Sequence, residues 1–356
     1  MYRSDCRHFK GDIPCRFHKE RGWICENCSA YDSIKERILI IKHGRMGDVL
    51  RTTPLLRKLK KEYPRAEIWW ITAYPELLPK IVDVPLAFDS AGILQVQTAK
   101  FHIAYNLDKY KLSCALMNQV SSLSKKGFYL SGNKIMPLPG AEYKFNTGID
   151  DRLSKANKKS YQEEMFEICG FRFANEDYVL DRRGQVLQGK LRFNSKGKIV
   201  GLNTGCGPDW KHRLWKTENW IMLGKLLREK GYVPVLLGGS QEHEMNIRIA
   251  KESGALYFGH FLFYDFVELV DRCDVVVSVV TLAMHIATAL RKKVIILNSI
   301  FNKNEHEFYG RGAVVEPEKP CKCYYGLECK NPDYFCMDTL KPGTVFNAIK
   351  EILNGS

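Results

Sequence analysis

Four apolar residues in succession, Ile38 to Ile41, predict a strand buried on both faces. A polar turn with two glycines follows at residues 43–47, and a helix is expected from Asp48 to residue 62. A second apolar run, Glu67–Thr72, predicts the next strand. One carboxylate, that of Asp48, is therefore expected where the first strand ends and the helix begins. In parallel sheets this edge is where ligands bind.

The same alternation continues over most of the chain. Further strands are predicted at Leu86–Phe88, Phe101–Leu107, Lys198–Asn203, Val233–Leu237, Asp274–Val280 and Lys293–Leu297, and further helices at Tyr161–Cys169, Glu218–Lys230 and Met284–Leu290. Strands that alternate with helices indicate parallel sheets. A polar break near residues 181–197 separates two such series. We therefore predict an α/β protein with a Cys-rich segment, residues 1–36, and two doubly wound domains, residues 37–185 and 186–356.

The 356-residue chain carries a formal net charge of +14. This excess indicates anionic partners such as phosphates or an anionic membrane face, although any one basic run can also be a solvated helix face. No nucleic-acid partner is expected, because no motif of nucleic-acid-binding proteins accompanies the charge. No run of about 18 apolar residues and no secretory signal is present, so we expect a cytoplasmic protein. A location at the inner face of the membrane and assembly into a homo-oligomer are both compatible with this composition.

The turn before Asp48 has the features of a ligand-binding loop. Gly44 and Gly47 let the backbone approach a ligand closely, and the first turn of the helix offers N–H groups and a partial positive charge. Asp48 can act on a ligand at this place, or it can simply cap the helix. The turn matches neither the G-x-G-x-x-G dinucleotide motif nor the P-loop.

A second loop, residues 204–216, follows the strand at Lys198–Asn203. It combines small residues with three cations, which suits a phosphate group. The alternative is a solvated loop around buried tryptophans. The candidate ligand-binding residues of this loop are Thr204, Gly205, Lys211, Arg213 and Lys216.

A third loop, residues 278–285, joins a very apolar strand to a helix. Thr281 is a natural N-cap, and the N–H groups after it can bind a diphosphate. The candidates on this loop are Thr281, Leu282, Ala283, Met284 and His285, of which the histidine can equally be structural. Glu242, after a Gly-Gly pair, is a candidate acceptor of hydrogen bonds from a sugar or a base.

These three loops, in this order, resemble glycosyltransferase family nine, the ADP-heptose heptosyltransferases. The first motif, Met-Gly-Asp-Val-Leu-x-Thr-x-Pro, is present as Met46 to Pro54. The second, Lys/Arg-x-Trp, is present as Arg213 to Trp215, and the third, Thr-x-x-x-His, as Thr281 to His285. The resemblance covers roughly residues 38–353.

The resemblance implies a GT-B fold, in which two Rossmann-like domains face a cleft. It places the acceptor on the N-terminal domain and the donor, ADP-heptose or a related nucleotide sugar, on the C-terminal one. Asp48 matches the family's proposed general base, which takes the proton of the attacking hydroxyl in an inverting transfer. Gly47, Arg51 and Thr52 fall on the acceptor side. Arg213 falls on the family's phosphate-binding lysine, and Lys211 and Lys216 are close enough in sequence to share its role. No catalytic metal is expected, because the chain has no Asp-x-Asp.

The third loop indicates one branch of this family. Val280 and Leu282 replace the Asp and Gly that lipopolysaccharide heptosyltransferases usually carry. This loop, with residues 300–302 and 307–312, looks more like the autotransporter heptosyltransferases, which modify serine or threonine of proteins. The implied acceptor is therefore a protein hydroxyl or a cell-envelope glycan. A lipopolysaccharide core heptosyltransferase is the alternative within the family, and a basic nucleic-acid-binding protein with metal knuckles is the alternative of another class.

Eight of the twelve cysteines form two clusters at the ends of the chain. The N-terminal cluster is Cys6, Cys15, Cys25 and Cys28, and the C-terminal cluster is Cys321, Cys323, Cys329 and Cys336. Four thiolates suit tetrahedral zinc or iron, so a structural metal is expected at each cluster, with unligated thiols as the alternative. The C-terminal cluster also matches in place the four-cysteine iron site of the autotransporter heptosyltransferases.

Overall fold

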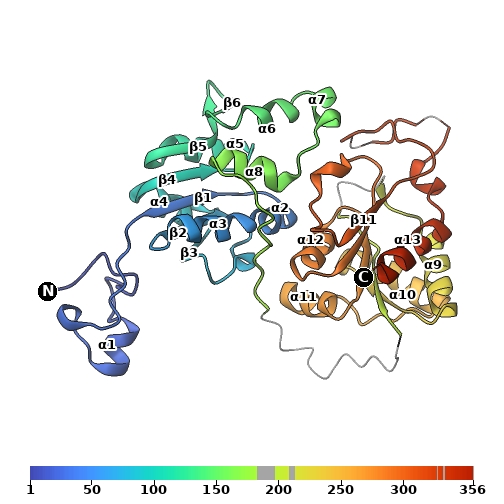
Figure 1. Ribbon diagram of the computed structural model, residues 1–356, viewed down its shortest axis with the longest axis horizontal. Coiled ribbons are helices and arrows are strands. Elements are labelled where there is room, and N and C mark those ends of the chain that lie inside the picture. The colour runs from blue at the N-terminus through green and yellow to red at the C-terminus, as the bar shows by residue number, and fades with distance from the viewer. Residues whose placement is uncertain (183–196, 208–212, 327, 332, 356) are drawn as a thin grey trace. The chain divides into compact units, whose positions relative to one another are not determined.

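The chain forms two compact units, which we call unit 1 and unit 2. Unit 1 comprises Met1–Asn146 and Glu163–Val179, and unit 2 comprises Thr147–Gln162 and Leu180–Ser356 (Figure 1). The structure, a computed structural model, describes residues 1–182, 197–207, 213–326, 328–331 and 333–355. The domain boundary expected at residues 185–186 lies outside the described residues and stays a prediction.

Unit 1 contains a six-stranded sheet in the order β3-β2-β1-β4-β5-β6. The first five strands are parallel to their neighbours, and β6 is antiparallel to β5. The strands are β1 (Arg37–Ile41), β2 (Glu67–Thr72), β3 (Val84–Ala87), β4 (Lys100–Asn106), β5 (Ser121–Ser131) and β6 (Lys134–Pro137).

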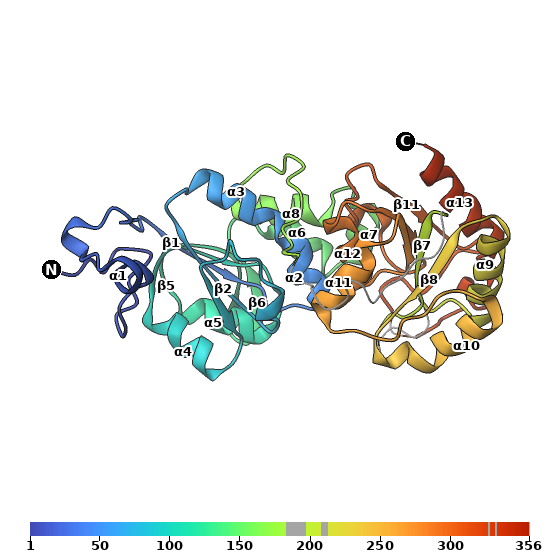
Figure 2. The same ribbon diagram turned by 90° about the horizontal axis from the view of Figure 1, so that it is seen from below.

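Helices cover both faces of this sheet, which explains the unbroken apolar run of β1. Leu39 and Ile41 belong to the cluster that packs against α4 and α5, while Ile38 and Ile40 point to the opposite face, and all four are fully buried. Figure 2 shows α3 and α4 on opposite sides of the sheet. The helices are α1 (Arg16–Arg21), α2 (Met46–Thr52), α3 (Pro54–Glu62), α4 (Ser90–Thr98), α5 (Lys111–Gln119), α6 (Glu142–Thr147) and α8 (Tyr161–Cys169).

The helix expected from Asp48 to residue 62 was wrong as a single element. It begins two residues earlier, at Met46, and is divided into α2 and α3 at Pro54. Proline has no N–H to continue α2, but its fixed φ suits the first turn of a new helix. The Thr53 hydroxyl stabilises the corner, because it donates to Leu50 O at 2.7 Å and accepts from Val179 N at 2.9 Å.

Unit 2 contains a five-stranded parallel sheet in the order β11-β10-β9-β7-β8. Its strands are β7 (Ile199–Asn203), β8 (Val233–Leu237), β9 (Val275–Ser278), β10 (Lys293–Leu297) and β11 (Gly312–Val315). The helices are α7 (Asp151–Ala156), α9 (Thr217–Glu229), α10 (His243–Ser253), α11 (Phe263–Asp271), α12 (Leu282–Ala289) and α13 (Pro342–Asn354). Figure 1 shows α11 and α12 on one side of the sheet and α9, α10 and α13 on the other.

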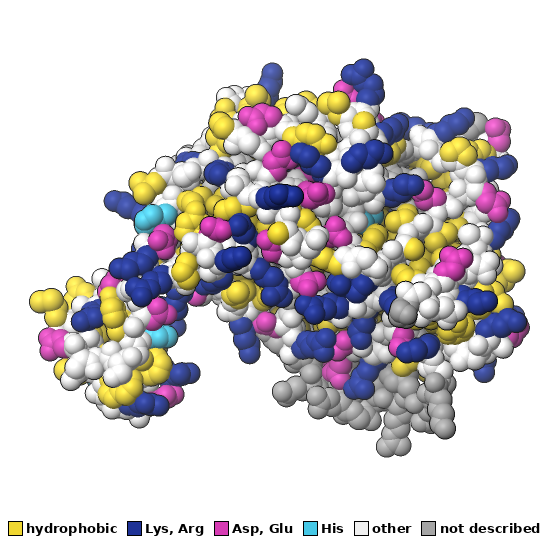
Figure 3. Space-filling view, in the orientation of Figure 1, with side chains coloured by type: hydrophobic (Ala, Val, Ile, Leu, Met, Phe, Trp, Pro, Cys, Tyr) yellow, Lys and Arg dark blue, Asp and Glu magenta, His cyan; other side chains and the backbone are white. Residues whose placement is uncertain are grey.

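The prediction of an α/β protein with two largely parallel sheets is confirmed. Among the described residues, no helix is both long and apolar enough to cross a membrane. Figure 3 shows that lysine and arginine side chains are spread over the visible face and are interspersed with acidic ones. The charge excess is therefore not gathered into one basic patch on that face.

Candidate functional site

The order of the strands locates a ligand-binding edge in each unit. In unit 1 the chain passes from β1 to β2 and β3 on one side and then returns to β4 on the other side of β1. In unit 2 it passes from β7 to β8 and then returns to β9 on the other side of β7. Open parallel sheets bind ligands at such switch points, outside the carboxyl ends of the two strands. The loops after β1 and β4, and those after β7 and β9, are therefore the candidate sites.

The two loops of unit 1 contact each other at the switch point. Gly44 N donates to Asp108 Oδ2 at 2.6 Å, and Lys42 Nζ lies 3.6 Å from the same oxygen and donates to Leu107 O at 3.1 Å. Gly44 has a φ of +31°, and a Cβ there would lie only 3.2 Å from the Asp48 Cβ. This explains the glycine, because a side chain at this point would meet both a strained backbone and the first turn of α2.

Asp48 does not occupy the N-cap position of α2. The N-cap is Arg45, and Asp48 is the third residue of the helix. Its Oδ1 lies 2.7 Å from Arg51 Nη2, and the carboxylate side chain is 31% exposed. The side chain is therefore held by a neighbouring cation and still reaches solvent, as a group that receives a proton from a ligand must.

The other residues expected on the acceptor side all lie in α2. Gly47 and Arg51 are in the first and last turns of the helix, and Arg51 contacts Asp48. The Thr52 hydroxyl donates to Asp48 O at 2.7 Å, and the residue is only 2% exposed. This bond is the local back-bond common for threonine in helices. Contact of these residues with an acceptor stays a prediction.

Sequence analysis missed a group of charges beside this loop. Asp108 and Lys109 follow the end of β4 after one intervening residue, and Lys144 lies 2.6 Å from the fully buried side chain of Glu164. Burial lowers the pKa of Lys109 to about 8, and the Lys144 cation adds to this effect. The signal was present in the sequence, since β4 was predicted and charged residues after a parallel strand lie at the ligand-binding edge.

The lowered pKa of Lys109 predicts a specific pH dependence of stability. The lysine is harder to protonate in the folded state than in the unfolded state, so its positive charge lowers the free energy of unfolding. This loss is fully present at neutral pH and becomes smaller as pH rises above about 8. We expect Lys109→Met to be more stable than wild type at pH 7, and its advantage to shrink by about 2 kcal/mol by pH 9.5. Urea unfolding of both proteins at the two pH values measures this. An advantage that does not change with pH would contradict the shift.

Asn203 organises the switch point of unit 2. Its Nδ2 donates to Gly205 O at 3.1 Å, to Ser278 Oγ at 3.1 Å and to Thr281 Oγ1 at 3.2 Å. Ser278 and Thr281 are also linked to each other, at 2.9 Å. One buried amide therefore ties the loop after β7 to the loop after β9. Asn203 and Ser278 were not among the predicted site residues, because only the pairing of β7 with β9 brings them together.

The third loop ends at the N-terminus of α12. Thr281 is the N-cap, as expected, but its side chain makes no capping bond and contacts Asn203 and Ser278 instead. The first turn, Leu282, Ala283 and Met284, thus begins a helix whose N–H groups carry a partial positive charge. His285 is 6% exposed, so it is mostly enclosed by the fold.

Thr204, Gly205 and Glu242 lie together on the other side of this loop. A Cβ on Gly205 would lie 2.1 Å from Glu242 Oε1, so a larger residue would displace this carboxylate. The second oxygen, Oε2, accepts from Gly239 N at 2.8 Å. The Thr204 hydroxyl donates to Asn246 Oδ1 at 2.6 Å, and both residues are buried. Thr204 therefore shapes the loop through its side chain.

Of the two described cations expected near the diphosphate, Arg213 is buried and Lys216 is exposed. Arg213 is 7% exposed, donates from Nη2 to Cys206 O at 3.0 Å, and its guanidinium carbon lies 5.1 Å from the centre of the Phe301 ring. Lys216 instead forms an ion pair of 2.7 Å with Asp338. Lys211 lies outside the described residues. Arg213 is thus fixed by the chain that surrounds it, and a fixed guanidinium suits an oxyanion of a phosphate.

The sulfur atoms of the C-terminal cysteines make hydrogen bonds within the cluster. Hydrogen bonds link Cys321 to Cys323 and Cys336, and Cys323 to Cys329, and Lys330 N donates to Cys323 Sγ at 3.0 Å. Burial raises the pKa of the Cys321 thiol to about 12, whereas at Cys323 burial is outweighed by these donors and the pKa is lowered.

Neither cysteine cluster stands as a finished metal site. In the part of the chain that is described, no three Cys, His, Asp or Glu side chains are arranged to hold an ion as they stand. The expected metals are therefore not confirmed and stay predictions.

One sequence-family model matches the chain. The sequence model of glycosyltransferase family 9 (heptosyltransferase) matches residues 133–322, which is more than half of the chain. A sequence comparison with curated proteins returns no significant match. The matched range covers the switch point of unit 2 but not Asp48.

Similar solved structures extend over nearly the whole chain. A family 9 glycosyl transferase of Veillonella parvula has a TM-score of 0.67 and 16% identity, and the alignment covers 91% of this chain and 98% of that one. The ADP-heptose lipopolysaccharide heptosyltransferase II of E. coli has a TM-score of 0.64 and 16% identity, and the alignment covers 90% of this chain and 99% of that one. The iron-containing dodecameric heptosyltransferase TibC of enterotoxigenic E. coli, in complex with ADP-D-β-D-heptose, has a TM-score of 0.58 and 12% identity. That alignment covers 90% of this chain and 77% of that one. At these identities the likeness shows a shared fold, that of GT-B-like glycosyltransferases.

Proposed function

Because the chain belongs to glycosyltransferase family 9, the heptosyltransferase family, we propose that it transfers heptose from ADP-heptose to a hydroxyl group with inversion at the anomeric carbon. The observation that carries this proposal is the switch point of unit 2. There the N-terminus of α12, the Asn203–Ser278–Thr281 network and the buried Arg213 lie in or beside the loops that follow β7 and β9. Hydroxyls, a helix N-terminus and a guanidinium are what a diphosphate needs.

In the proposed reaction the acceptor oxygen attacks the anomeric carbon of the heptose. The acceptor proton moves to the Asp48 carboxylate, and the bond between that carbon and the diphosphate oxygen breaks. The leaving ADP gains negative charge, which Arg213 and the N–H groups of α12 stabilise. Gly205 and Glu242 contact the sugar or the base in this proposal, and Lys211, Lys216 and His285 line the donor site. Gly47, Arg51 and Thr52 lie toward the acceptor.

We propose a protein serine or threonine, or a cell-envelope glycan, as the acceptor. The absence of an aspartate at Val280 favours the protein-modifying branch. The lipopolysaccharide heptosyltransferase II of E. coli also shares the fold, so the fold does not separate the two kinds of enzyme. The identity of the acceptor separates them.

A structural metal at the C-terminal cluster belongs to the same proposal. Cys321 contacts Cys323 and Cys336, Cys323 contacts Cys329, and four thiolates are a donor set that fits iron or zinc. These residues hold a segment of the chain in this proposal, and no step of the transfer passes through them. A cytoplasmic location, contact with the inner face of the membrane, and assembly into a homo-oligomer likewise stay proposals.

Transfer to defined acceptors tests the function. The purified chain is incubated with ADP-heptose and either a serine- and threonine-containing protein passenger domain or a lipopolysaccharide core glycan, and the acceptor mass is measured. We expect one acceptor to gain heptose while ADP accumulates. Release of an epimerised donor without transfer would show that the protein acts as an epimerase and would contradict the proposed transfer. No turnover, together with salt-dependent RNA or DNA binding, would support the nucleic-acid-binding alternative.

A further inference from the structure

The first 36 residues have a defined fold without a hydrophobic core. None of them is fully buried, yet they form α1, a short 3₁₀ turn at Cys25–Asn27 and an antiparallel bridge between Cys6 and Ser33. A segment of this size rarely buries enough apolar surface to fold alone, and natural proteins often supply a metal in its place. Burial of apolar side chains therefore contributes little to the stability of these turns.

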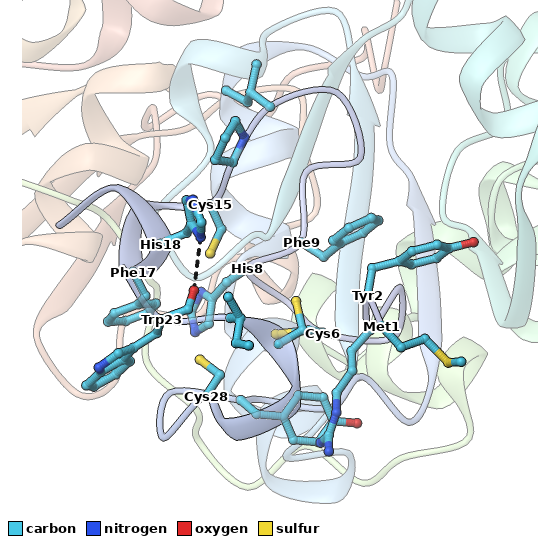
Figure 4. Close-up of a pocket in the computed structure, with 16 residues that line it drawn as sticks. Met1, Tyr2, Cys6, His8, Phe9, Cys15, Phe17, His18, Trp23 and Cys28 are labelled. Carbon is cyan, nitrogen blue, oxygen red and sulfur yellow. Dashed lines mark hydrogen bonds between the residues drawn. The ribbon is translucent and has the colours of Figure 1, made fainter. Parts of the chain in front are cut away.

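All four N-terminal cysteines line one cavity of about 370 Å³. Figure 4 shows Cys6, Cys15 and Cys28 around this space, with His8 and His18 beside them. None of the four thiols is in a disulfide, and each is half-buried. Thiols that come from separate turns and line one space provide the donor set of a structural metal site.

The local backbone pairs these thiols. Cys25 and Cys28 are three residues apart across a 3₁₀ turn, and side chains at this spacing lie on one face. Cys15 precedes the first turn of α1, and Cys6 lies in the bridge to Ser33. Two thiols therefore come from the 3₁₀ turn, and two come from the segments that pack around it.

The two imidazoles are already engaged in the fold. His18 Nδ1 lies 3.1 Å from the Trp23 carbonyl oxygen, which can only accept, so this nitrogen carries the proton. The His8 ring packs against the edge of Phe17, with 4.9 Å between ring centres. The Nε2 of His18 then carries no proton and is itself able to ligate a metal, but the four thiols complete a tetrahedral set without it.

We propose that Cys6, Cys15, Cys25 and Cys28 bind one Zn²⁺ as four thiolates. Binding turns the thiol side chains inward around the ion, since as described they are not yet gathered at ligand distance. Each thiol releases its proton to solvent as it ligates the metal. Nothing in the transfer reaction depends on this site. The metal proposal can therefore be tested independently of the proposed function.

The site has a consequence for unit 1 through Arg7, the neighbour of Cys6. Arg7 Nε donates to Asp32 at 3.0 Å, and Nη1 pairs with Asp83 at 2.5 Å. Asp83 in turn accepts from Lys60 Nζ and from Ile68 N, both at 2.8 Å. A metal that holds Cys6 against the 3₁₀ turn therefore fixes Arg7 on the edge of the sheet.

Metal content of the full-length protein tests this proposal. We expect Cys25→Ser/Cys28→Ser to contain about one equivalent of zinc per chain less than wild type. Cys321→Ser/Cys323→Ser is the matched control for the other cluster: it loses only the metal of that cluster, so at least one equivalent of zinc should remain. His18→Ala should keep the zinc content of wild type. Equal zinc in wild type and in the N-terminal variant overturns the proposal. Iron in place of zinc overturns the choice of metal, and loss of zinc in His18→Ala overturns the four-thiolate set.

Limited proteolysis provides a second test of the metal site and needs no variant. Trypsin should cut wild type within residues 1–35 at least tenfold faster after a chelator has removed the metal, and added Zn²⁺ should restore resistance. The far-UV circular dichroism of the two α/β units should not change. If cleavage is equally fast with and without the chelator, no metal holds this segment.

Discussion

Asp48→Asn should lower kcat for heptose transfer by roughly 10²- to 10⁴-fold, the usual loss when a general base is removed. The amide has the shape of the carboxylate but cannot take the acceptor proton. The affinity for ADP-heptose should stay within about twofold of wild type, because donor binding is assigned to unit 2. The decisive measurement is therefore kcat together with a calorimetric Kd for the donor.

Asp265→Asn is the matched control for this variant. Asp265 is the third residue of α11, as Asp48 is the third residue of α2, so both changes remove the same charge from the same place in a helix. Asp265→Asn should leave kcat near wild type. If Asp48→Asn also turns over near the wild-type rate, the carboxylate contributes only to α2 and to its ion pair with Arg51.

Arg213→Met should weaken ADP-heptose binding by roughly 10- to 100-fold, since charge-assisted hydrogen bonds contribute about 1.5–3 kcal/mol. The guanidinium is fixed between Cys206 O and the Phe301 ring, so it meets the diphosphate without further ordering. Methionine keeps most of the volume and loses the charge. Calorimetric titration with ADP-heptose and with ADP alone measures the loss, and both ligands should be affected alike.

Lys216→Met is the control that separates position from charge. Lys216 is a nearby cation, but its ammonium is paired with Asp338, so its removal should weaken donor binding by less than Arg213→Met does. Because Arg213 is buried, the melting temperature of each variant must be recorded beside its Kd. Donor affinity that is unchanged in a folded Arg213→Met protein would remove this residue from the diphosphate site.

Strands were predictable wherever they are buried on both faces. The runs at Ile38–Ile41, Glu67–Thr72 and Val233–Leu237 became β1, β2 and β8 almost to the residue, because helices cover both faces of each sheet. The helix after β1 was misjudged because its apolar spacing continues through Pro54. The backbone of proline decided that point, and the hydrophobic pattern did not.

The candidate sites were predictable only in part, for a related reason. Loops that follow strands could be found from local sequence, and so Asp48, Arg213 and Thr281 were named. Asp108 also follows a predicted strand, but its contact with the loop after β1, like the role of Asn203, depends on which strands pair. Asn203 matters since β7 lies beside β9, and Asp108 matters since β4 lies beside β1. Strand order is a long-range property that no single loop encodes.

Binding of the donor tests the central claim most directly. Wild type is titrated calorimetrically with ADP-heptose, and its melting temperature is recorded with and without this ligand and with a UDP-sugar as the control. A ligand of the folded state raises the melting temperature, so we expect one ADP-heptose bound per chain, a rise of several degrees, and little effect of the UDP-sugar. No heat and no shift with ADP-heptose, or a shift with the UDP-sugar alone, would contradict the account.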